Sequence, residues 1–598
     1  MMDATTIAQM FLDITTKFSD KVLFTATEGD SWREYTGKEA REIVEEATYG
    51  LASLGIQPND KVGILSANCP HWAYSDYAIA CSGAASVTIY PTLIPSQIQY
   101  IAEHSESKAI FAQDREQVEK LIQIKDQCPQ LKVVICYDDS ENFDLDYVIS
   151  FSDLREKGKA FASSDQAFKF EERVKLVKPD DLLTLIYTSG TTGPPKGVML
   201  THHNLVSDIN ASLQVLHVDD NDTFLSFLPL SHSFERMAGH LLATSVGATI
   251  GYAQSTETVL ADMKAVNPSV MASVPRLYEK MYAGVQAKFA AGSPLKQKIA
   301  HWAIETGKRH AVKRKNGSVG GWLNMKNGLA DKLVFSKVKE LLGTRFRFFV
   351  SGGAPLAADI GSFFDAVGIK ILEGYGLTET SPVITVNPLE DYRFGTVGPP
   401  IPGVEVKIAE DGEILTRGPN VMKGYYRDEA ATREAINEEG WFYTGDIGIM
   451  EDGYLKITDR KKNLIVTAGG KNIAPAGLEN ALVLSPFIEQ VVVIGDKRRF
   501  VSALIVPAFQ ALNEWAANHS IPSSDRSVLL ADPKVQELFQ TEVDKAMHNF
   551  ARFEIVKKFT LLSKEFTIED GSLTPSLKIK RKVVEERYKD LIDKLYEE

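Results

Sequence analysis

Hydrophobic and polar positions in the first 180 residues of the chain alternate between two periods. Apolar positions at helical spacing run over residues 37–54 and stop before Gly55, which suits a helix C-cap. Short apolar runs predict strands at residues 61–66, 85–90 and 108–112. The segments between them predict helices at residues 72–82 and 95–103. Because strands and helices alternate, we expect a mainly parallel sheet covered by helices.

The second half of the chain changes its pattern twice. Strand-like runs at 222–228 and 346–350 continue the α/β pattern, whereas residues 392–450 contain short strands separated by turns and predict a compact β-rich subdomain. After a glycine turn near residue 470, strands at 490–494 and 501–506 precede helices that extend to about residue 550. We therefore predict an α/β fold with two parts. A large N-terminal domain (1–458) holds helix-covered sheets and the β-rich subdomain, and a small α+β domain spans 459–598.

Length and composition restrict the classes of protein. A chain of 598 residues is too long for one core, and its 44% hydrophobic and 24% charged residues are typical of globular proteins. A net charge of −13 argues against general nucleic-acid binding, because a phosphate backbone would repel it. The four cysteines share no metal-ligand spacing and form no disulfide framework, which predicts reduced thiols in a cytoplasmic protein. No signal peptide is visible, and no apolar run reaches the roughly 18 residues of a membrane span, so we expect any membrane contact to be peripheral.

The densest chemical signal is the stretch LLTLIYTSGTTGPPKGVMLTHHN at residues 182–204. An apolar run at 182–187 predicts a buried strand, and 198–200 predicts another. The turn between them combines glycines, hydroxyl groups and one lysine, which together can surround a phosphate: Thr188, Ser189, Gly190, Thr191, Thr192, Gly193 and Lys196. It is not a Walker loop, because Lys196 is followed by Gly197 rather than Ser or Thr. The alternative is an ordinary hairpin loop, which the density of donors disfavours.

Three later turns also follow predicted strands. His232 lies in PLSHSFER, just past the strand at 222–228, where open α/β sheets tend to place ligands. The motifs SGGAPL and LEGYGLTET form a candidate slot for a flat ring from Gly353, Ala354, Pro355, Glu373, Gly374, Tyr375 and Gly376. Thr378 can donate to a phosphate. Glu379 is the plausible Mg²⁺ ligand, with Thr188 as a second candidate.

Residues 283–345 differ from the rest because cations outnumber acids and alternate with apolar positions at helical spacing. One interpretation is a solvated helical insertion. The other is a basic amphipathic surface that meets anionic lipid and receives a membrane-partitioned substrate. The sequence leaves both open.

Taken together, these motifs resemble the AMP-forming acyl-CoA synthetases of the adenylate-forming superfamily, most closely the long-chain fatty acid–CoA ligase type. The resemblance covers essentially the whole chain and rests on YTSGTTGPPKGVMLTHHN, PLSHSFER, YGLTET, YTGD, the run DRKKNLIVTAGGKN and TPSLKIKRK in family order. It implies a two-step reaction of a fatty acid with ATP, Mg²⁺ and coenzyme A. An acyl-adenylate and diphosphate form first, and then acyl-CoA and AMP.

The resemblance also implies roles for residues in the large domain. His232 and Arg236 would face the acyl substrate, Tyr375 would lie beside adenine and Thr378 on phosphate. Glu379 would bind Mg²⁺, and Asp446 of the YTGD motif would bind the ribose hydroxyls. Catalytic roles would fall to Lys578, His232, Glu379 and Thr188.

For the small domain, the resemblance implies a hinge at Asp459 and a mobile domain beyond it. Arg460 would bind nucleotide, with Lys462 and Asn472 as further contacts, and Gly469, Gly470 and Lys471 would form the turn that meets CoA. A lysine near the C-terminus would reach the first active site. The motif places it at Lys578, although Leu577 replaces the usual glycine and leaves Lys580 as the alternative. Other interpretations are an acyl carrier protein or aryl-CoA ligase of the same superfamily, and a non-catalytic acyl- or nucleotide-binding relative.

Overall fold

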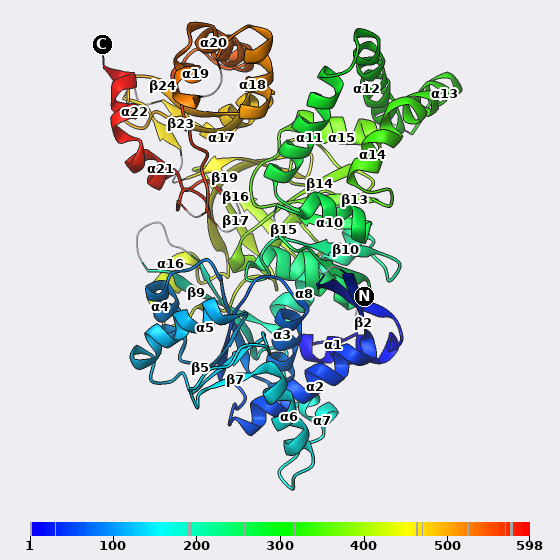
Figure 1. Cartoon of the computed structure of the whole chain (residues 1–598), viewed down its shortest axis with the longest axis vertical. Coiled ribbons are helices and arrows are strands. Elements are labelled where there is room, and N and C mark those ends of the chain that lie inside the picture. The colour runs from blue at the N-terminus through cyan, green and yellow to red at the C-terminus, as the bar shows by residue number, and fades with distance from the viewer. Residues whose placement is uncertain are drawn as a thin grey trace.

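The computed structural model of the chain shows a large body with a small domain at one end (Figure 1). It describes residues 3–29, 31–188, 194–255, 257–315, 317–461, 464–468, 471–522, 525–568, 570–574 and 578–597. Among these residues, none of the helices combines the length and the apolar character of a membrane span. The predicted α/β class with a β-rich subdomain and a small α+β domain is confirmed.

The first sheet of the large domain is the predicted parallel one. Its strand order is β18-β9-β8-β4-β3-β5-β6-β7, and the strands from β8 to β7 run parallel. Its members are β3 (Lys61–Leu65), β4 (Ala85–Ile89), β5 (Ser107–Ala112), β6 (Val133–Cys136), β7 (Val148–Ser150), β8 (Leu182–Thr188), β9 (Lys196–Thr201) and β18 (Gly424–Tyr425).

Helices cover both faces of this sheet because successive strand residues point to opposite sides. Val62 and Ile64 of β3 share a core with helices on one face, α2 (Gly37–Ser53) and α3 (Pro70–Ser82). On the other face, Leu65 packs with α4 (Pro95–Ser105) and α5 (Arg115–Ile124). The candidate phosphate turn joins β8 to β9, which pair antiparallel as a hairpin at the sheet's margin.

A second sheet, in the order β15-β14-β13-β12-β10-β11-β1-β2, brings the remaining motifs together. The chain's first two strands join this sheet, because β1 pairs parallel with β11. The five strands from β14 to β11 are parallel, so their carboxyl ends meet at one edge. Its members are β1 (Val22–Glu28), β2 (Ser31–Thr36), β10 (Thr223–Ser226), β11 (Thr249–Tyr252), β12 (Val270–Ser273), β13 (Phe348–Ser351), β14 (Lys370–Gly376) and β15 (Val383–Val386).

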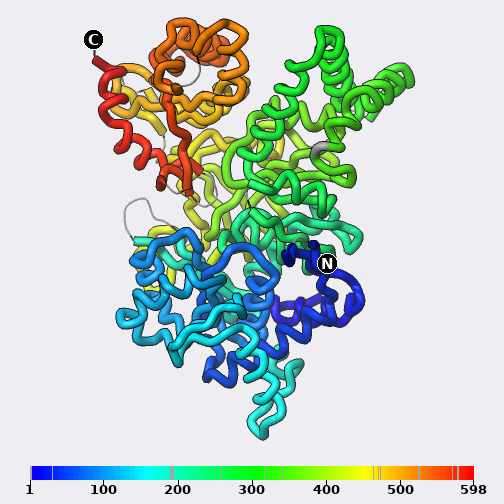
Figure 2. The backbone as a smooth tube through the Cα atoms, in the orientation of Figure 1, coloured from blue at the N-terminus to red at the C-terminus, as the bar shows by residue number. Residues whose placement is uncertain are grey.

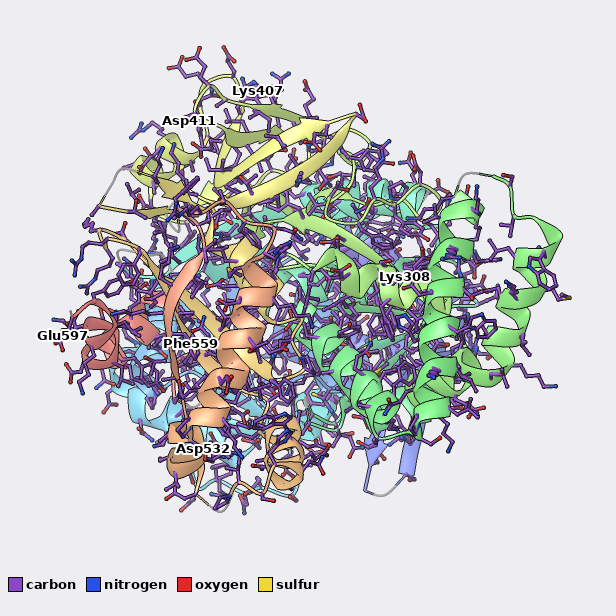
Figure 3. All side chains as sticks on the ribbon, turned by 90° about the horizontal axis from the view of Figure 1, so that it is seen from above. Lys308, Lys407, Asp411, Asp532, Phe559 and Glu597 are labelled. Atoms are coloured by element: carbon purple, nitrogen blue, oxygen red, sulfur yellow. The ribbon has the colours of Figure 1, made fainter. Side chains whose placement is uncertain are left out.

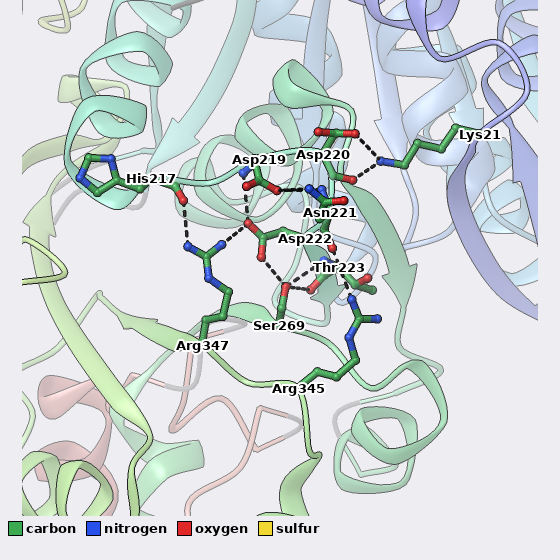
Figure 4. Close-up of polar contacts among 10 residues, drawn as sticks. All are labelled: Lys21, His217, Asp219, Asp220, Asn221, Asp222, Thr223, Ser269, Arg345 and Arg347. Atoms are coloured by element: carbon green, nitrogen blue, oxygen red, sulfur yellow. Dashed lines mark hydrogen bonds and ion pairs between the residues drawn. The ribbon is translucent and has the colours of Figure 1, made fainter.

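A buried polar cluster fixes the N-terminal end of β10, whose other end leads to His232 (Figure 4). Asp222, which is buried, forms an ion pair with Arg347 and accepts a hydrogen bond of 2.7 Å from the hydroxyl of Ser269. The same hydroxyl oxygen accepts a hydrogen bond of 2.9 Å from the backbone N–H of Thr223. The strand that leads to the candidate histidine is therefore held at its N-terminal end.

Two smaller parts complete the chain. The predicted β-rich subdomain is an antiparallel sheet of β16 (Glu405–Ile408), β17 (Glu413–Arg417), β19 (Phe442–Glu451) and β20 (Tyr454–Arg460). The C-terminal domain has its own apolar core around the sheet β23-β24-β25 (Figure 2). Its elements are β21 (Ile465–Val466), β22 (Asn472–Ile473), α17 (Pro475–Leu482), β23 (Ile488–Ile494), β24 (Val501–Pro507), α18 (Phe509–Asn518), α19 (Arg526–Ala531), α20 (Pro533–Met547), β25 (Val556–Leu561), α21 (Arg581–Arg587) and α22 (Lys589–Tyr596).

The compositionally distinct segment is helical, as predicted. It forms α11 (Pro275–Ala290), α12 (Pro294–Lys315), α13 (Gly321–Ala330), the π-helical turn η3 (Asp331–Phe335) and α14 (Ser336–Leu342). Helices α12 and α13 project from the body beside the C-terminal domain (Figure 1).

Arg236 corrects one prediction from the sequence. It lies on the π-helix η2 (Glu235–Leu241), and its side chain is 2% exposed. Its guanidinium donates to both carboxylate oxygens of Asp76, at 2.9 and 2.7 Å, and to the hydroxyl of Ser86 at 3.0 Å. Because this fork is occupied by Asp76, Arg236 joins η2 to α3 inside the core rather than facing a substrate.

Breaking this buried pair should lower stability strongly. Arg236→Met leaves Asp76 buried without its partner, and we expect the unfolding free energy of the large domain to fall by about 3–5 kcal/mol. Denaturant unfolding followed by tryptophan fluorescence would measure it. The control is Arg33→Met, which breaks an exposed pair with Glu28 and should cost less than about 1 kcal/mol. If Arg236→Met left stability unchanged and raised the KM for the acid substrate, the result would instead support a substrate-binding role for Arg236.

Candidate active site

The candidate site is a cavity of about 1000 Å³ that both domains line. The large domain contributes the ends of β8, β13 and β14, the loop after β10 and the start of β9. The C-terminal domain contributes Thr574, Lys578 and Lys580. Sequence segments that are hundreds of residues apart therefore share one site.

Lys578 reaches this cavity from a short loop of the C-terminal domain. The loop is held by an antiparallel bridge between Leu573 and Ile579 and by a hydrogen bond of 2.8 Å from the backbone N–H of Thr574 to the carbonyl of Lys578. On the opposite wall, a side chain at Gly353 would place its Cβ 3.2 Å from Cε of Lys578, so the glycine leaves room for the lysine. Lys580 is exposed and touches only the cavity's rim.

Burial makes Lys578 easier to deprotonate than a surface lysine. Desolvation lowers the pKa of Lys578 to about 8, the nearby charge of Arg460 lowers it further, and Asp446 opposes both effects. At neutral pH the ammonium group is therefore still charged at the cavity wall.

His232 is a neutral hydrogen-bond donor at this site. The backbone N–H of Phe234 donates to its Nδ1 at 3.1 Å, so Nδ1 carries a lone pair and the proton of the neutral ring is on Nε2. Burial and the positive charge of Lys578 lower the pKa of His232 to about 3. The ring is therefore uncharged at physiological pH, with an N–H group available to an acceptor in the cavity.

Tyr375, Asp446 and Arg460 form a connected polar group at another part of the wall. The Tyr375 hydroxyl donates to Oδ2 of Asp446 at 2.7 Å, and Nε of Arg460 lies 3.1 Å from Oδ1. Strand pairing explains the second contact, because Asp446 of β19 is directly opposite Arg460 of β20. Asp446 is buried, and desolvation raises its pKa.

The phosphate-binding candidates converge near Tyr425. Its hydroxyl donates to Oε1 of Glu379 at 2.9 Å, and the Nζ of Lys196 lies 4.9 Å from the centre of its ring. The hydroxyls of Thr378 and Ser233 lie 3.2 Å apart. Sequence reasoning missed Tyr425, because GYY matches no motif and the pairing of β18 with β9 brings it to the site.

The donor set fits a magnesium ion that arrives with a nucleotide. Among the described residues, no group of three or more His, Cys, Asp or Glu could hold a metal by itself. The Glu379 carboxylate and the Thr188 hydroxyl both line the cavity, and Mg²⁺ is commonly bound by one or two such oxygens together with phosphates and water.

Several predicted residues lie elsewhere or serve the fold. Glu373 is buried and accepts backbone N–H groups of Leu356 and Gly395 at 3.3 and 3.2 Å, so it braces the β14 end behind the cavity. A Cβ at Gly376 would lie 1.6 Å from the carbonyl oxygen of Pro382, which makes glycine a steric requirement there. Gly353, Gly374 and Gly376 line the cavity, whereas Ala354, Pro355 and Glu373 do not.

Of the candidate CoA turn, Lys471 is the part that the structure describes, and it does not line the cavity. Lys471 is exposed and lies over the ring of Phe553, at 5.7 Å, within the C-terminal domain. Ser189, Gly190, Thr191, Thr192, Gly193, Lys462, Gly469 and Gly470 lie outside the described residues, as does the side chain of Asn472.

Part of the cavity lining is apolar. It comes from α8 (His202–Leu216) and the consecutive helices η2 and α9 (Leu242–Val246), which pack together. It includes Leu216, Met237, Ala238 and Leu242. Because these side chains are far apart in sequence and read as ordinary core positions, the sequence did not single them out.

Two family models match the chain. The AMP-binding enzyme model matches residues 13–426, and the AMP-binding enzyme C-terminal domain model matches residues 462–598. Curated relatives are similar over nearly the same length. The "Long-chain-fatty-acid--CoA ligase FadD15" of Mycobacterium bovis is 38% identical, over 96% of this chain and 94% of its own. "Long chain acyl-CoA synthetase 6, peroxisomal" of Arabidopsis thaliana is 35% identical, over 92% of this chain and 79% of its own.

Solved structures share the fold at lower identity. The adenylation domain of a carboxylate reductase from Mycobacterium chelonae has a TM-score of 0.79 at 21% identity, covering 99% of this chain and 91% of that one. The ATP-bound MatB from Rhodopseudomonas palustris has a TM-score of 0.68 at 22% identity, covering 98% and 99%. With two matched models, near full-length relatives and one cavity shared by both domains, the chain belongs to the family of adenylate-forming, AMP-binding enzymes.

Proposed function

We propose that this adenylate-forming enzyme is a long-chain fatty acid–CoA ligase, which converts fatty acid, ATP and CoA into acyl-CoA, AMP and diphosphate. The observation that carries the proposal is that Lys578 and His232 line one cavity, part of whose lining is apolar. The names of the near full-length relatives support the same substrate class.

In the first step, a carboxylate oxygen attacks the α-phosphorus of ATP and the bond to the leaving diphosphate breaks. His232 donates Nε2–H to the carboxylate and aims it, and Thr378 donates to a phosphate oxygen. Asp446 accepts hydrogen bonds from the ribose hydroxyls, which replace the hydrogen bond from the Tyr375 hydroxyl. Mg²⁺, when bound by Glu379 and Thr188, supplies positive charge to the phosphates. Lys578 completes the site, because a charged ammonium offsets the repulsion between carboxylate and phosphate.

In the second step, the CoA sulfur attacks the acyl carbon and AMP leaves. Lys578 lines the cavity in the present arrangement, while Lys471 of the candidate CoA turn does not. The C-terminal domain must therefore move between the steps, with Asp459 as the hinge. Its buried carboxylate accepts the N–H of Ala476 at 3.3 Å and so links β20 to the start of α17.

The apolar lining from α8 and η2–α9 is the proposed acyl site. Each buried CH₂ group contributes about 0.8 kcal/mol, so an apolar wall favours long chains over short ones until that wall is covered. Leu216, Met237 and Leu242 supply that wall. A benzoate could not extend along it.

A substrate panel tests the proposed function. We expect release of diphosphate from Mg·ATP to be faster with palmitate than with octanoate or benzoate, and to rise sharply when CoA is added. A discontinuous assay for diphosphate and acyl-CoA would measure both products. Activity restricted to benzoate, or palmitate turnover that CoA leaves unchanged, would redirect the assignment to an aryl-CoA or an acyl carrier protein ligase. ATP binding without diphosphate release would indicate a non-catalytic relative.

Stiffening the proposed hinge should unbalance the two steps. Asp459→Pro fixes φ and removes a backbone N–H, so we expect the ratio of adenylate formation to thioester formation to change by roughly tenfold or more. Each half-reaction would be measured separately, the second from supplied acyl-adenylate. Asp459→Ala is the control, since it removes the carboxylate but leaves the main chain free. Equal retention of both steps in the proline variant would contradict the hinge.

A further inference from the structure

The helical insertion carries a charge opposite to that of the chain. Residues 294–342 contain eleven Lys and Arg and three Asp and Glu, a net charge of +8 in a protein whose total is −13. The rest of the chain therefore carries −21. Such an asymmetry is a property of one surface, because the segment forms the projecting helices α12 and α13 (Figure 1).

A stripe of large apolar side chains runs along the projecting part and faces solvent. Trp322, Met325, Leu329 and Leu333 follow one another at intervals of three or four residues, which places them on one side of α13 and η3. They are 66, 59, 51 and 40% exposed. The other side of the same segment packs against the protein, where Ala330, Val334 and Phe335 are buried.

Unpaired cations border this apolar stripe. The Nζ of Lys326 lies 5.1 Å from the centre of the Trp322 ring, and Lys332 is exposed next to Leu333. On the neighbouring helix α12, Arg309 and Lys313 are exposed. Within the part of the chain that the structure describes, these four cations have no ion pair, whereas the segment's Arg314 and Lys339 pair with Asp365 and Asp331.

The two helices form a fixed platform rather than a loose extension. A Cβ at Gly307 of α12 would lie 2.4 Å from the carbonyl oxygen of Ala366, so α12 packs backbone to backbone against α15 (Ala358–Val367). Nε2 of His310 and Oδ1 of Asn324 lie 2.8 Å apart and join α12 to α13. Seen from above, α12 and α13 lie side by side at one edge of the molecule, and Lys308 is labelled beside α12 (Figure 3).

We propose that the α12–α13 platform binds the surface of an anionic phospholipid bilayer. Trp322, Met325, Leu329 and Leu333 would enter the boundary between headgroups and acyl chains, and the bordering lysines would contact lipid phosphates. The remaining surface, at −21, would be repelled by the same bilayer, so the protein would dock in one orientation. The idea that the bilayer also supplies the acid substrate rests on the proposed function, whereas binding of the platform to the bilayer does not.

A lipid surface fits the platform better than a second copy of the chain or another protein. Two copies would bring faces of +8 together, and lysine is depleted in protein–protein interfaces. Exposed aromatic and aliphatic side chains among lysines are the composition of helices that lie in the membrane interface.

Vesicle co-sedimentation of the full chain, without ATP or fatty acid, tests this proposal. We expect binding to phosphatidylcholine vesicles that contain about 30 mol% phosphatidylglycerol and roughly tenfold weaker binding to phosphatidylcholine alone. The variant Trp322→Ser/Met325→Ser/Leu329→Ser should weaken binding by about tenfold or more, and Lys326→Glu/Lys332→Glu should do so most clearly at low salt.

The matched control is Leu176→Ser/Val528→Ser, which removes two apolar side chains that are 68 and 61% exposed elsewhere on the protein and should leave binding unchanged. Quenching of fluorescence by brominated lipid should be smaller in Trp322→Phe than in the unaltered protein. Equal binding by the platform variant and the control would overturn the proposal. The proposal would also be overturned if the unaltered protein formed a concentration-dependent dimer that the serine variant does not form, and neither protein bound vesicles.

Discussion

The chemistry of this family brings a carboxylate against a triphosphate, and the structure is arranged around the repulsion between them. Two unit charges about 4 Å apart repel by about 4 kcal/mol at an effective dielectric constant of about 20, and a closed site lowers screening further. Cations must therefore be present at the moment of attack, and water must be absent. In the proposed reaction Lys578 supplies the cation, because the C-terminal domain brings it to the cavity wall. The lowered pKa of its ammonium group is the consequence of placing it there.

In the proposed reaction, the same constraint accounts for a division of the chain into a part that recognises the substrates and a part that carries the lysine. The candidate recognition side chains lie at or after strand ends of the large domain, where a polar cluster anchors β10 and strand pairing sets Asp446 opposite Arg460. Lys578 comes from the C-terminal domain and lines the cavity opposite Gly353 of the large domain. The proposed domain movement would withdraw Lys578 and let a thiol approach. A rigid site built entirely on one domain could not both exclude water in the first step and admit CoA in the second.

Most of the fold and much of the site could be predicted from the sequence, because the chemistry lies in turns that directly follow apolar strand runs. Such turns fix a residue's place on a sheet edge, as for His232, Tyr375 and Glu379. What could not be predicted depends on pairing between distant segments. Tyr425 reaches Glu379 through the pairing of β18 with β9, and Arg236 meets Asp76 across two helices. The family resemblance placed Arg236 near the substrate, but its buried guanidinium pairs with the carboxylate of Asp76 on α3.

The pH dependence of the adenylation half-reaction tests whether a charged Lys578 completes the adenylation site. Because the lysine's pKa is lowered, its charge is present below about pH 8 and is lost as pH rises through that value, so kcat/KM for the acid should fall there. Lys578→Arg keeps a charge in this range and should remove the fall, whereas Lys580→Arg, at the exposed rim, should retain it. If kcat/KM fell in Lys578→Arg as it does in the unaltered enzyme, the result would contradict a role for the charge of Lys578.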